Sequence, residues 1–182
     1  MRRKLSNIVS VVHSFFRFCI MRLITSDGMQ IDGIVERFSP NVIVEVERKG
    51  RMKIGKKVRA HSGCIFKVRK NAELILEDEC SFNYGCMVFC RKKIVICEGV
   101  EFGPSVKIYD HDHDYRVAGG VKAGLFSSDD VFIGKNSWIG ANTVILKGTC
   151  LGENCVVGAG SILKGSYPDN SVIIQKRETC VK

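Results

Sequence analysis

Hydrophobic positions recur every six residues in the C-terminal part of the chain. Between residues 131 and 165 this position holds an aliphatic side chain each time: Ile133, Ile139, Ile145, Leu151, Val157 and Leu163. Four residues after each of the first five stands a small side chain: Ser137, Thr143, Thr149, Cys155 and Ser161. A period of six fits neither the 3.6 of an α-helix nor the 2.0 of a simple strand. Self-similarity at a fixed period indicates a solenoid, and hexapeptide repeats are typical of β-helices.

Each hexad predicts one short strand followed by a turn. The aliphatic side chain points into a narrow prism, and the small side chain packs beside it. Gly or Asn takes the turn, where a positive φ costs these residues least. Three hexads then close one triangular coil of about 18 residues.

The spacing of six continues upstream of residue 131. It relates three further sets of residues: Ile96, Phe102 and Ile108; Leu76, Phe82 and Val88; and, more loosely, Ile54, Ala60 and Phe66. Residues 25–53 carry turn signals and an apolar stretch at 41–47, which predicts a first, irregular rung. We therefore divide the chain into an N-terminal basic amphipathic helix (1–26), a β-helix (27–175) and a basic C-terminal tail (176–182).

Residues 1–24 open with a basic cluster and continue as a hydrophobic stretch that His13, Arg17 and Arg22 interrupt. These interruptions argue against a signal peptide and against a membrane-spanning helix. Two interpretations remain open. The helix contacts an anionic membrane surface, or it packs on the solenoid and covers its end rung.

The hexad pattern breaks at residues 114–130 and resumes at 131. Gly119, Gly120 and Gly124 fall in this stretch. Repeat proteins place such insertions on one face, often the binding face. The sequence therefore predicts an extruded loop near 114–130.

The histidine cluster stands directly before this loop. His111 and His113 alternate with Asp110, Asp112 and Asp114. In an extended segment both histidines would share one face, with the carboxylates opposite. Histidine suits general-base catalysis near neutral pH, and a solvated polar turn is the alternative.

The composition of the chain limits the classes of molecule that it is expected to bind. The formal net charge of +9 indicates anionic partners. No zinc-finger or RNA-binding signature occurs, so we expect no nucleic acid. Nine cysteines, an odd number without a CxxC pair, indicate reduced thiols in a cytoplasmic protein.

A metal site is the rival interpretation of the histidines. An HxH pair can supply two of three ligands at a catalytic zinc. The third would have to be a carboxylate or His61, which belongs to a much earlier rung. We expect no metal.

Three segments resemble the hexapeptide-repeat acyltransferases, in particular the sugar O-acetyltransferases similar to galactoside and maltose acetyltransferases. They are SFNYGC (81–86), FGPSVKIYDHDH (102–113) and the hexads of 131–165, which the turn YPDNSVI (167–173) closes. The resemblance covers about residues 54–175. It implies an all-β, left-handed parallel β-helix and a homotrimer with active sites between adjacent subunits. It also implies direct transfer of an acetyl group from acetyl-CoA to a hydroxyl in a ternary complex.

The resemblance also implies site residues. The family's catalytic base follows its GPxV motif at a distance that lands on His113, with His111 as the alternative. Asn83 matches an asparagine near the acceptor, and we assign Asp112 and Tyr115 to substrate binding as well. The acetyl-CoA groove is expected along Trp138, Gly140, Ala141, Gly158, Ala159 and Lys164. The CoA phosphates need cations, for which Lys176 and Arg177 are candidates.

Together these features predict an acetyl-CoA-dependent O-acetyltransferase. Its acceptor is expected in bacterial surface polysaccharide (capsule, lipopolysaccharide or exopolysaccharide), and its place is the cytoplasm, at the inner face of the membrane. Three alternatives remain: N-acetyl transfer to an amino sugar, a non-catalytic β-helix scaffold, and a zinc-dependent carbonic anhydrase-like protein.

Overall fold

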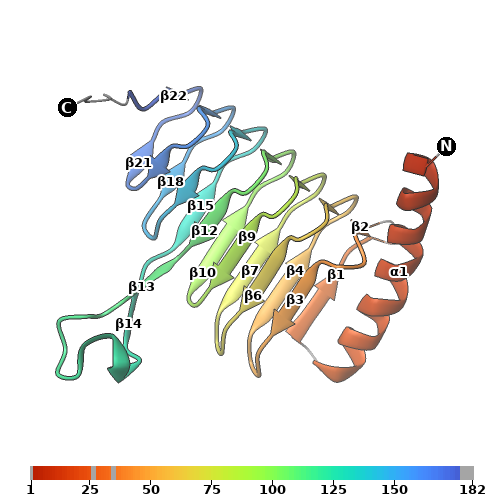
Figure 1. Cartoon of the computed structure of the whole chain (residues 1–182), viewed down its shortest axis with the longest axis horizontal. Coiled ribbons are helices and arrows are strands. Elements are labelled where there is room, and N and C mark those ends of the chain that lie inside the picture. The colour runs from red at the N-terminus through yellow and green to blue at the C-terminus, as the bar shows by residue number, and fades with distance from the viewer. Residues whose placement is uncertain (1, 26–27, 34–35, 177–182) are drawn as a thin grey trace, which may run out of the picture.

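The chain winds into a three-sided parallel β-coil with one long helix at its N-terminal end (Figure 1). The computed structural model describes residues 2–25, 28–33 and 36–176, with side chains from residue 7 onward. The strands visit sheets A, B and C in turn, so each rung contributes one strand to each side of the prism.

Sheets A and B have seven strands each, and sheet C has six. Sheet A consists of β1 (Met29–Ile31), β4 (Arg51–Ile54), β7 (Glu73–Leu76), β10 (Lys93–Ile96), β15 (Val131–Ile133), β18 (Cys150–Leu151) and β21 (Ser166–Tyr167). Sheet B consists of β2 (Arg37–Phe38), β5 (Arg59–Ala60), β8 (Ser81–Phe82), β11 (Glu101–Phe102), β16 (Trp138–Ile139), β19 (Val156–Val157) and β22 (Val172–Ile173). Sheet C consists of β3 (Ile43–Val46), β6 (Ile65–Val68), β9 (Met87–Cys90), β12 (Lys107–Tyr109), β17 (Val144–Ile145) and β20 (Ile162–Leu163).

The predicted inward positions fill the core. All six aliphatic residues of 131–165 and all five small residues after them are buried. Upstream, aromatic side chains stack along the prism: the ring of Phe66 lies 5.5 Å from Phe38 and 5.0 Å from Phe82, and Phe82 lies 4.7 Å from Phe102. The parallel hexapeptide β-helix predicted from the sequence is confirmed.

The corners of the coil explain why Asn and Gly recur in the repeat. Asn136 and Asn154 occupy the corner between sheets A and B with φ of 56° and 55°. Asn tolerates this left-handed conformation better than most residues. Gly134 is required for a different reason, because a Cβ there would lie 2.4 Å from the carbonyl carbon of Gly152.

A ribbon leaves the coil after β12. Strands β13 (His111–His113) and β14 (Phe126–Ser128) pair antiparallel, and the short 3₁₀ helix η2 (Gly120–Ala123) lies in the loop between them. Figure 1 shows this ribbon projecting away from the prism. The extruded loop predicted near 114–130 is therefore confirmed, although the excursion begins with the histidines.

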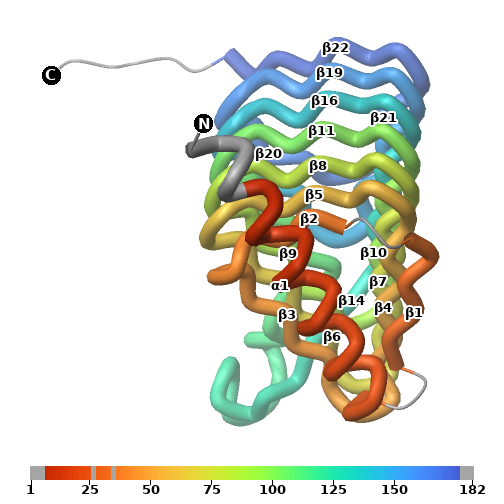
Figure 2. The backbone as a smooth tube through the Cα atoms, turned by 90° about the vertical axis from the view of Figure 1, so that its right-hand side faces the viewer, coloured from red at the N-terminus to blue at the C-terminus, as the bar shows by residue number. Residues whose placement is uncertain are grey.

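Helix α1 (Arg2–Ile24) covers the first rung (Figure 2). The Ser14 hydroxyl accepts a hydrogen bond from the backbone N–H of Phe38 at 2.9 Å. The buried ring of Phe18 meets that of Phe38 edge-on at 5.1 Å. The helix therefore packs on the end of the solenoid, which is one of the two interpretations that the sequence left open.

Helix α1 also carries an extensive exposed apolar surface. Its large exposed side chains are Ile8, Val9, Val12, Phe15, Phe16, Ile20, Leu23 and Ile24. Residues 7–24 are also long and apolar enough to cross a membrane, although Arg17 and Arg22 interrupt them. The coil therefore covers one face of this helix and leaves these apolar side chains largely exposed.

Candidate functional site

The two histidines lie on one face of β13, at the root of the ribbon. Both contact the ring of Phe126 on β14, His111 at 5.6 Å and His113 at 4.4 Å between ring centroids. His111 is partly buried, whereas His113 is exposed. The shared face agrees with the expectation for an extended segment.

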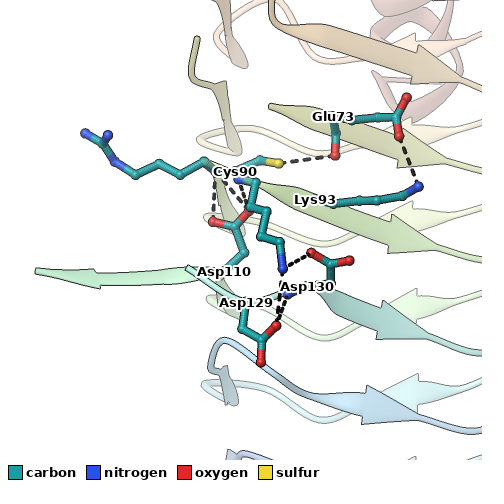
Figure 3. A network of polar contacts seen from close by, with 8 residues as sticks. Glu73, Cys90, Lys93, Asp110, Asp129 and Asp130 are labelled. Carbon is teal, nitrogen blue, oxygen red and sulfur yellow. Dashed lines mark hydrogen bonds and ion pairs between the residues drawn. The ribbon is translucent and has the colours of Figure 1, made fainter. Parts of the chain in front are cut away.

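The expectation that all the carboxylates would point away from the histidines is wrong for Asp110. Its side chain is fully buried, and its Oδ1 lies 2.9 Å from Nδ1 of His111. The same carboxylate accepts hydrogen bonds from the backbone N–H groups of Arg91 and Lys92, at 2.8 and 2.7 Å (Figure 3). Asp110 precedes β13, so the strand alternation does not apply to it.

These hydrogen bonds determine the ionisation of Asp110. Burial alone would raise its pKa, but the hydrogen bonds from His111 and from the backbone of Lys92 and Arg91 outweigh burial and lower the pKa. The ionised carboxylate accepts a hydrogen bond from Nδ1–H of His111, so in the neutral ring Nε2 is the nitrogen that carries no proton.

Two cationic side chains from other rungs, Arg91 and Lys147, contact the ribbon. The guanidinium of Arg91 lies 3.3 Å from the centroid of the Phe126 ring, a cation–π contact. Nζ of Lys147 lies 2.8 Å from the Ser127 hydroxyl and 3.1 Å from Asp112. Arg91 and Lys147 come from the rungs on either side of the ribbon, so no local sequence signal links them to it.

Lys92 fixes the other end of the ribbon. Its ammonium pairs with Asp130 at 2.9 Å and with Asp129 at 3.4 Å, where β14 returns to the coil (Figure 3). Ribbon and coil are thus joined by charged contacts on both strands.

The expected cofactor residues gather at the corner between sheets B and C. Trp138, on β16, is 57% exposed. Gly140 stacks on the rung of Gly158, since a Cβ at Gly140 would lie 2.6 Å from the Val157 carbonyl oxygen. Ala141 and Ala159 follow on the same corner, where Gly160 N–H donates to the Ala141 carbonyl. Gly140 therefore lets two successive rungs pack closely at this corner, beside the exposed indole of Trp138.

The expected cations lie elsewhere. Lys164 follows β20 at the corner between sheets C and A, and it shares a cavity of about 530 Å³ with Ser127 and Lys147. Lys176 is exposed beyond β22, and Arg177 lies outside the described residues. Tyr115 is 71% exposed in the ribbon loop, with the Arg116 guanidinium 5.8 Å from its ring.

Asn83 lines a polar cavity of about 480 Å³ between α1 and the corner of sheets B and C, together with His61 and Tyr84. The rings of His61 and Tyr84 lie 4.9 Å apart. Asn83 precedes the strands of sheet C, whereas the histidines follow them. One chain therefore places Asn83 and His113 at opposite ends of sheet C.

The zinc interpretation finds no geometric support among the described residues. No group of three or more His, Cys, Asp or Glu side chains is close enough there to hold a metal ion. His61 stacks on Tyr84 at the polar cavity instead of approaching the ribbon.

Comparison with known proteins places the repeat. Residues 130–165 match the model of the bacterial transferase hexapeptide (six repeats). A galactoside O-acetyltransferase of Lactococcus lactis is 37% identical over 94 residues, which are 50% of this chain and 43% of the relative. WbbJ of Escherichia coli, provisionally named an O-acetyl transferase of lipopolysaccharide biosynthesis, is 48% identical over 46 residues, 25% of this chain and 24% of WbbJ. The chain spans about half or less of the length of these curated relatives.

Among solved structures, the coil is similar to AntD, an N-acyltransferase from Bacillus cereus in complex with dTDP and 3-hydroxybutyryl-CoA. The TM-score is 0.65 at 18% identity, over 82% of this chain and 80% of AntD, which establishes a common fold. The resemblance to the hexapeptide-repeat acyltransferases, sugar O-acetyltransferases among them, is thereby confirmed, and residues 130–165 carry their repeat.

Proposed function

We propose that this protein transfers an acetyl group from acetyl-CoA to a hydroxyl of a sugar in bacterial surface polysaccharide or its precursor. The observation that carries the proposal is the pairing of a hexapeptide coil with a ribbon that presents two histidines beside it. Sequence similarity to a galactoside O-acetyltransferase and to WbbJ supports the O-acetyl and polysaccharide assignment.

In the proposed reaction one histidine moves one proton while the acetyl group is transferred. A histidine takes the proton of the acceptor hydroxyl while the oxygen attacks the thioester carbonyl, so a C–O bond forms. The C–S bond then breaks, and the proton passes to the leaving CoA thiolate. No acyl-enzyme is needed, because donor and acceptor are bound together.

His113 is the proposed base. It stands exposed on the ribbon, where a bound acceptor reaches it, and its ring is supported by Phe126. His111 has the carboxylate partner but is less accessible. We assign His111 and Asp110 to positioning the ribbon, with His111 as the alternative base.

Acetyl-CoA fits the edge between sheets B and C. Gly140, Ala141, Gly158 and Ala159 put no large side chain on this edge beside the exposed Trp138, and the CoA phosphates would need the cations at the C-terminal rungs. When bound there, the cofactor supplies the activated acetyl group.

The active unit is a homotrimer, with each site formed between two subunits. The supporting geometry is the separation of Asn83 and His113 across sheet C, because a site that uses both then needs a second chain. Subunit complementation tests this. His113→Ala and Asn83→Ala are each expected to be inactive, and refolding them together should restore about a quarter of the activity. No recovery in mixed trimers would contradict the shared site.

Assaying thiol release with acetyl-CoA and a panel of sugars tests the activity. We expect acceptor-dependent CoA release that Trp138→Ala and His113→Ala both reduce. Purified protein that neither binds acetyl-CoA at millimolar concentration nor releases CoA would overturn the transferase and favour the scaffold alternative.

We also place the protein at the cytoplasmic face of an anionic membrane, through α1. Residues 1–24 contain Arg2, Arg3, Lys4, Arg17 and Arg22 and no acidic residue. An apolar face with flanking cations binds anionic bilayers. Co-sedimentation with phosphatidylglycerol vesicles should fall in Phe16→Glu and not in Phe132→Glu, which changes an exposed Phe on the coil. Equal sedimentation of the two variants would contradict membrane contact through α1.

A further inference from the structure

Two adjoining cavities lie between α1 and sheet B. The apolar cavity, about 500 Å³, is lined on its helix side by Ile8, Val11 and Val12. The polar cavity, about 480 Å³, contains His61, Asn83 and Tyr84. Both are bordered by Asn7, Arg37 and Arg59, which form the junction between them. A ligand that fills both cavities passes these two arginines.

The junction carries positive charge. Arg37 and Arg59 are register partners on the neighbouring strands β2 and β5. Glu101 pairs with one guanidinium nitrogen of Arg59 at 3.0 Å, and a guanidinium offers five N–H donors. At the far side of the apolar cavity, Lys57 and Glu79 neutralise each other at 2.6 Å. No carboxylate is among the residues that line the polar cavity.

Each part of this path selects a different chemistry. Guanidinium groups bind phosphate oxygens with directed, charge-assisted hydrogen bonds. Asn83, Tyr84 and the serines of the polar cavity offer hydrogen bonds to hydroxyl groups. Ile8, Val11 and Val12 offer only apolar surface, which favours an aliphatic chain.

We propose that the acceptor is an amphiphile: a sugar joined through phosphate to a long aliphatic chain. The sugar occupies the polar cavity, the phosphate lies at Arg37 and Arg59, and the chain follows Ile8, Val11 and Val12 along α1. This inference rests on the proposed function, because Asn83 belongs to the same acceptor site. A nucleoside diphosphate sugar would use the same arginines but would leave the apolar cavity unused.

Calorimetric titration with three probes separates these chemistries. Dodecyl phosphate below its micelle concentration carries both the anion and the chain. UDP carries the anion on a nucleoside, without the chain, and dodecyl maltoside carries the chain with a neutral sugar. We expect dodecyl phosphate to bind at least about tenfold more tightly than either of the others.

Two matched pairs of variants locate the binding. Val12→Ser should weaken dodecyl phosphate about fivefold and leave UDP unchanged. Val9→Ser is its control, because Val9 is similarly exposed, at 48% against 50%, and lines neither cavity. Arg59→Gln should weaken both phosphate probes about tenfold or more. Arg51→Gln is its control, since Arg51 also pairs with a glutamate, Glu73, at 3.2 Å and lines neither cavity.

Different results of these titrations support or overturn the lipid-linked acceptor. Tight UDP binding that depends on Arg59, with no effect of Val12→Ser, would overturn the lipid-linked acceptor in favour of a nucleotide sugar. The inference would be overturned if dodecyl phosphate did not bind, or if it bound equally well to all the variants. A neighbouring subunit that fills the cavities would give the first of these results. Titration of the same samples with acetyl-CoA shows separately whether the transferase assignment stands.

Discussion

Replacing Asp110 tests whether the root of the ribbon is held by one buried carboxylate. The side chain is fully buried, and it accepts hydrogen bonds from two backbone N–H groups and from His111. Asp110→Ala removes the acceptor and leaves the N–H groups of Arg91 and Lys92 unpaired, whereas Asp110→Asn keeps one oxygen and removes the charge.

The loss of unfolding free energy expected for Asp110→Ala follows from these hydrogen bonds. An unpaired buried donor costs about 1–3 kcal/mol, and the two N–H groups here are only partly buried. We therefore expect Asp110→Ala to lower the free energy of unfolding by about 2–4 kcal/mol. For a chain of this length each kcal/mol corresponds to about 2–4 °C in Tm. Asp110→Asn should cost about half as much, because hydrogen bonds to a neutral acceptor are weaker.

Asp112→Ala is the matched control. Asp112 is two residues away and exposed, and it makes one surface ion pair with Lys147. Such pairs contribute about 0–1 kcal/mol. Denaturant unfolding followed by circular dichroism should be run at one protomer concentration, because assembly changes apparent stability. Hydrogen exchange at the Arg91 and Lys92 amides reports the same loss locally.

The pH dependence has a fixed sign. The folded-state pKa of Asp110 is lowered, so its stabilisation is present above the ordinary aspartate pKa near 4 and is lost as the pH falls through the lower, folded value. The stability difference between wild type and Asp110→Asn should therefore shrink on acidification below about pH 4. An Asp110→Ala variant as stable as Asp112→Ala, with unchanged amide exchange, would refute the reasoning.

Three further substitutions probe the chemistry and the core. His113→Ala should lower the transfer rate about 10²–10⁴-fold with acetyl-CoA binding retained; a larger loss in His111→Ala, measured side by side, would move the base to His111. Trp138→Ala should weaken acetyl-CoA binding in calorimetry with little change in Tm, and a lower Tm with intact binding would make the indole a packing residue. Phe82→Ala interrupts the aromatic stack in the prism and should destabilise the fold by about 3–5 kcal/mol in denaturant unfolding, whereas a loss below about 1 kcal/mol would mean that the core collapses around the gap.

The coil could be predicted because its pattern depends only on the spacing of residues along the sequence. Each rung repeats the same inward positions, so the spacing of six alone predicts that Ile133, Ile139 and Ile145 are buried. The turn residues could also be predicted, since Asn136 and Asn154 lie where the backbone needs a positive φ. The ribbon could be located as a break in the period, but its pairing could not be read from the sequence.

The contacts of the site were less predictable, because they join different rungs. Arg91 reaches Phe126 across 35 positions of sequence, and Lys147 reaches Asp112 from the following rung. The role of Asp110 was missed because alternation places it opposite the histidines, whereas it precedes the strand and turns inward. Arg37 and Arg59 lie in the least regular part of the coil, and only α1 makes a cavity of them.

The order of the rungs sets the height of each site element along the axis of the coil. Asn83 follows β8, the histidine ribbon belongs to the rung of β11, and Trp138 opens β16. These three strands are consecutive neighbours in sheet B, so each step is one strand spacing of about 4.8 Å. In a trimer whose coils run parallel, the subunits keep these heights, and the ribbon of one chain lies at a level between the acceptor residue and the cofactor edge of its neighbour. A single inserted rung would shift one partner by about 4.8 Å, more than a hydrogen bond can span. The regular repeat therefore does more than fill a core: it fixes the axial spacing of the groups that the proposed transfer must bring together.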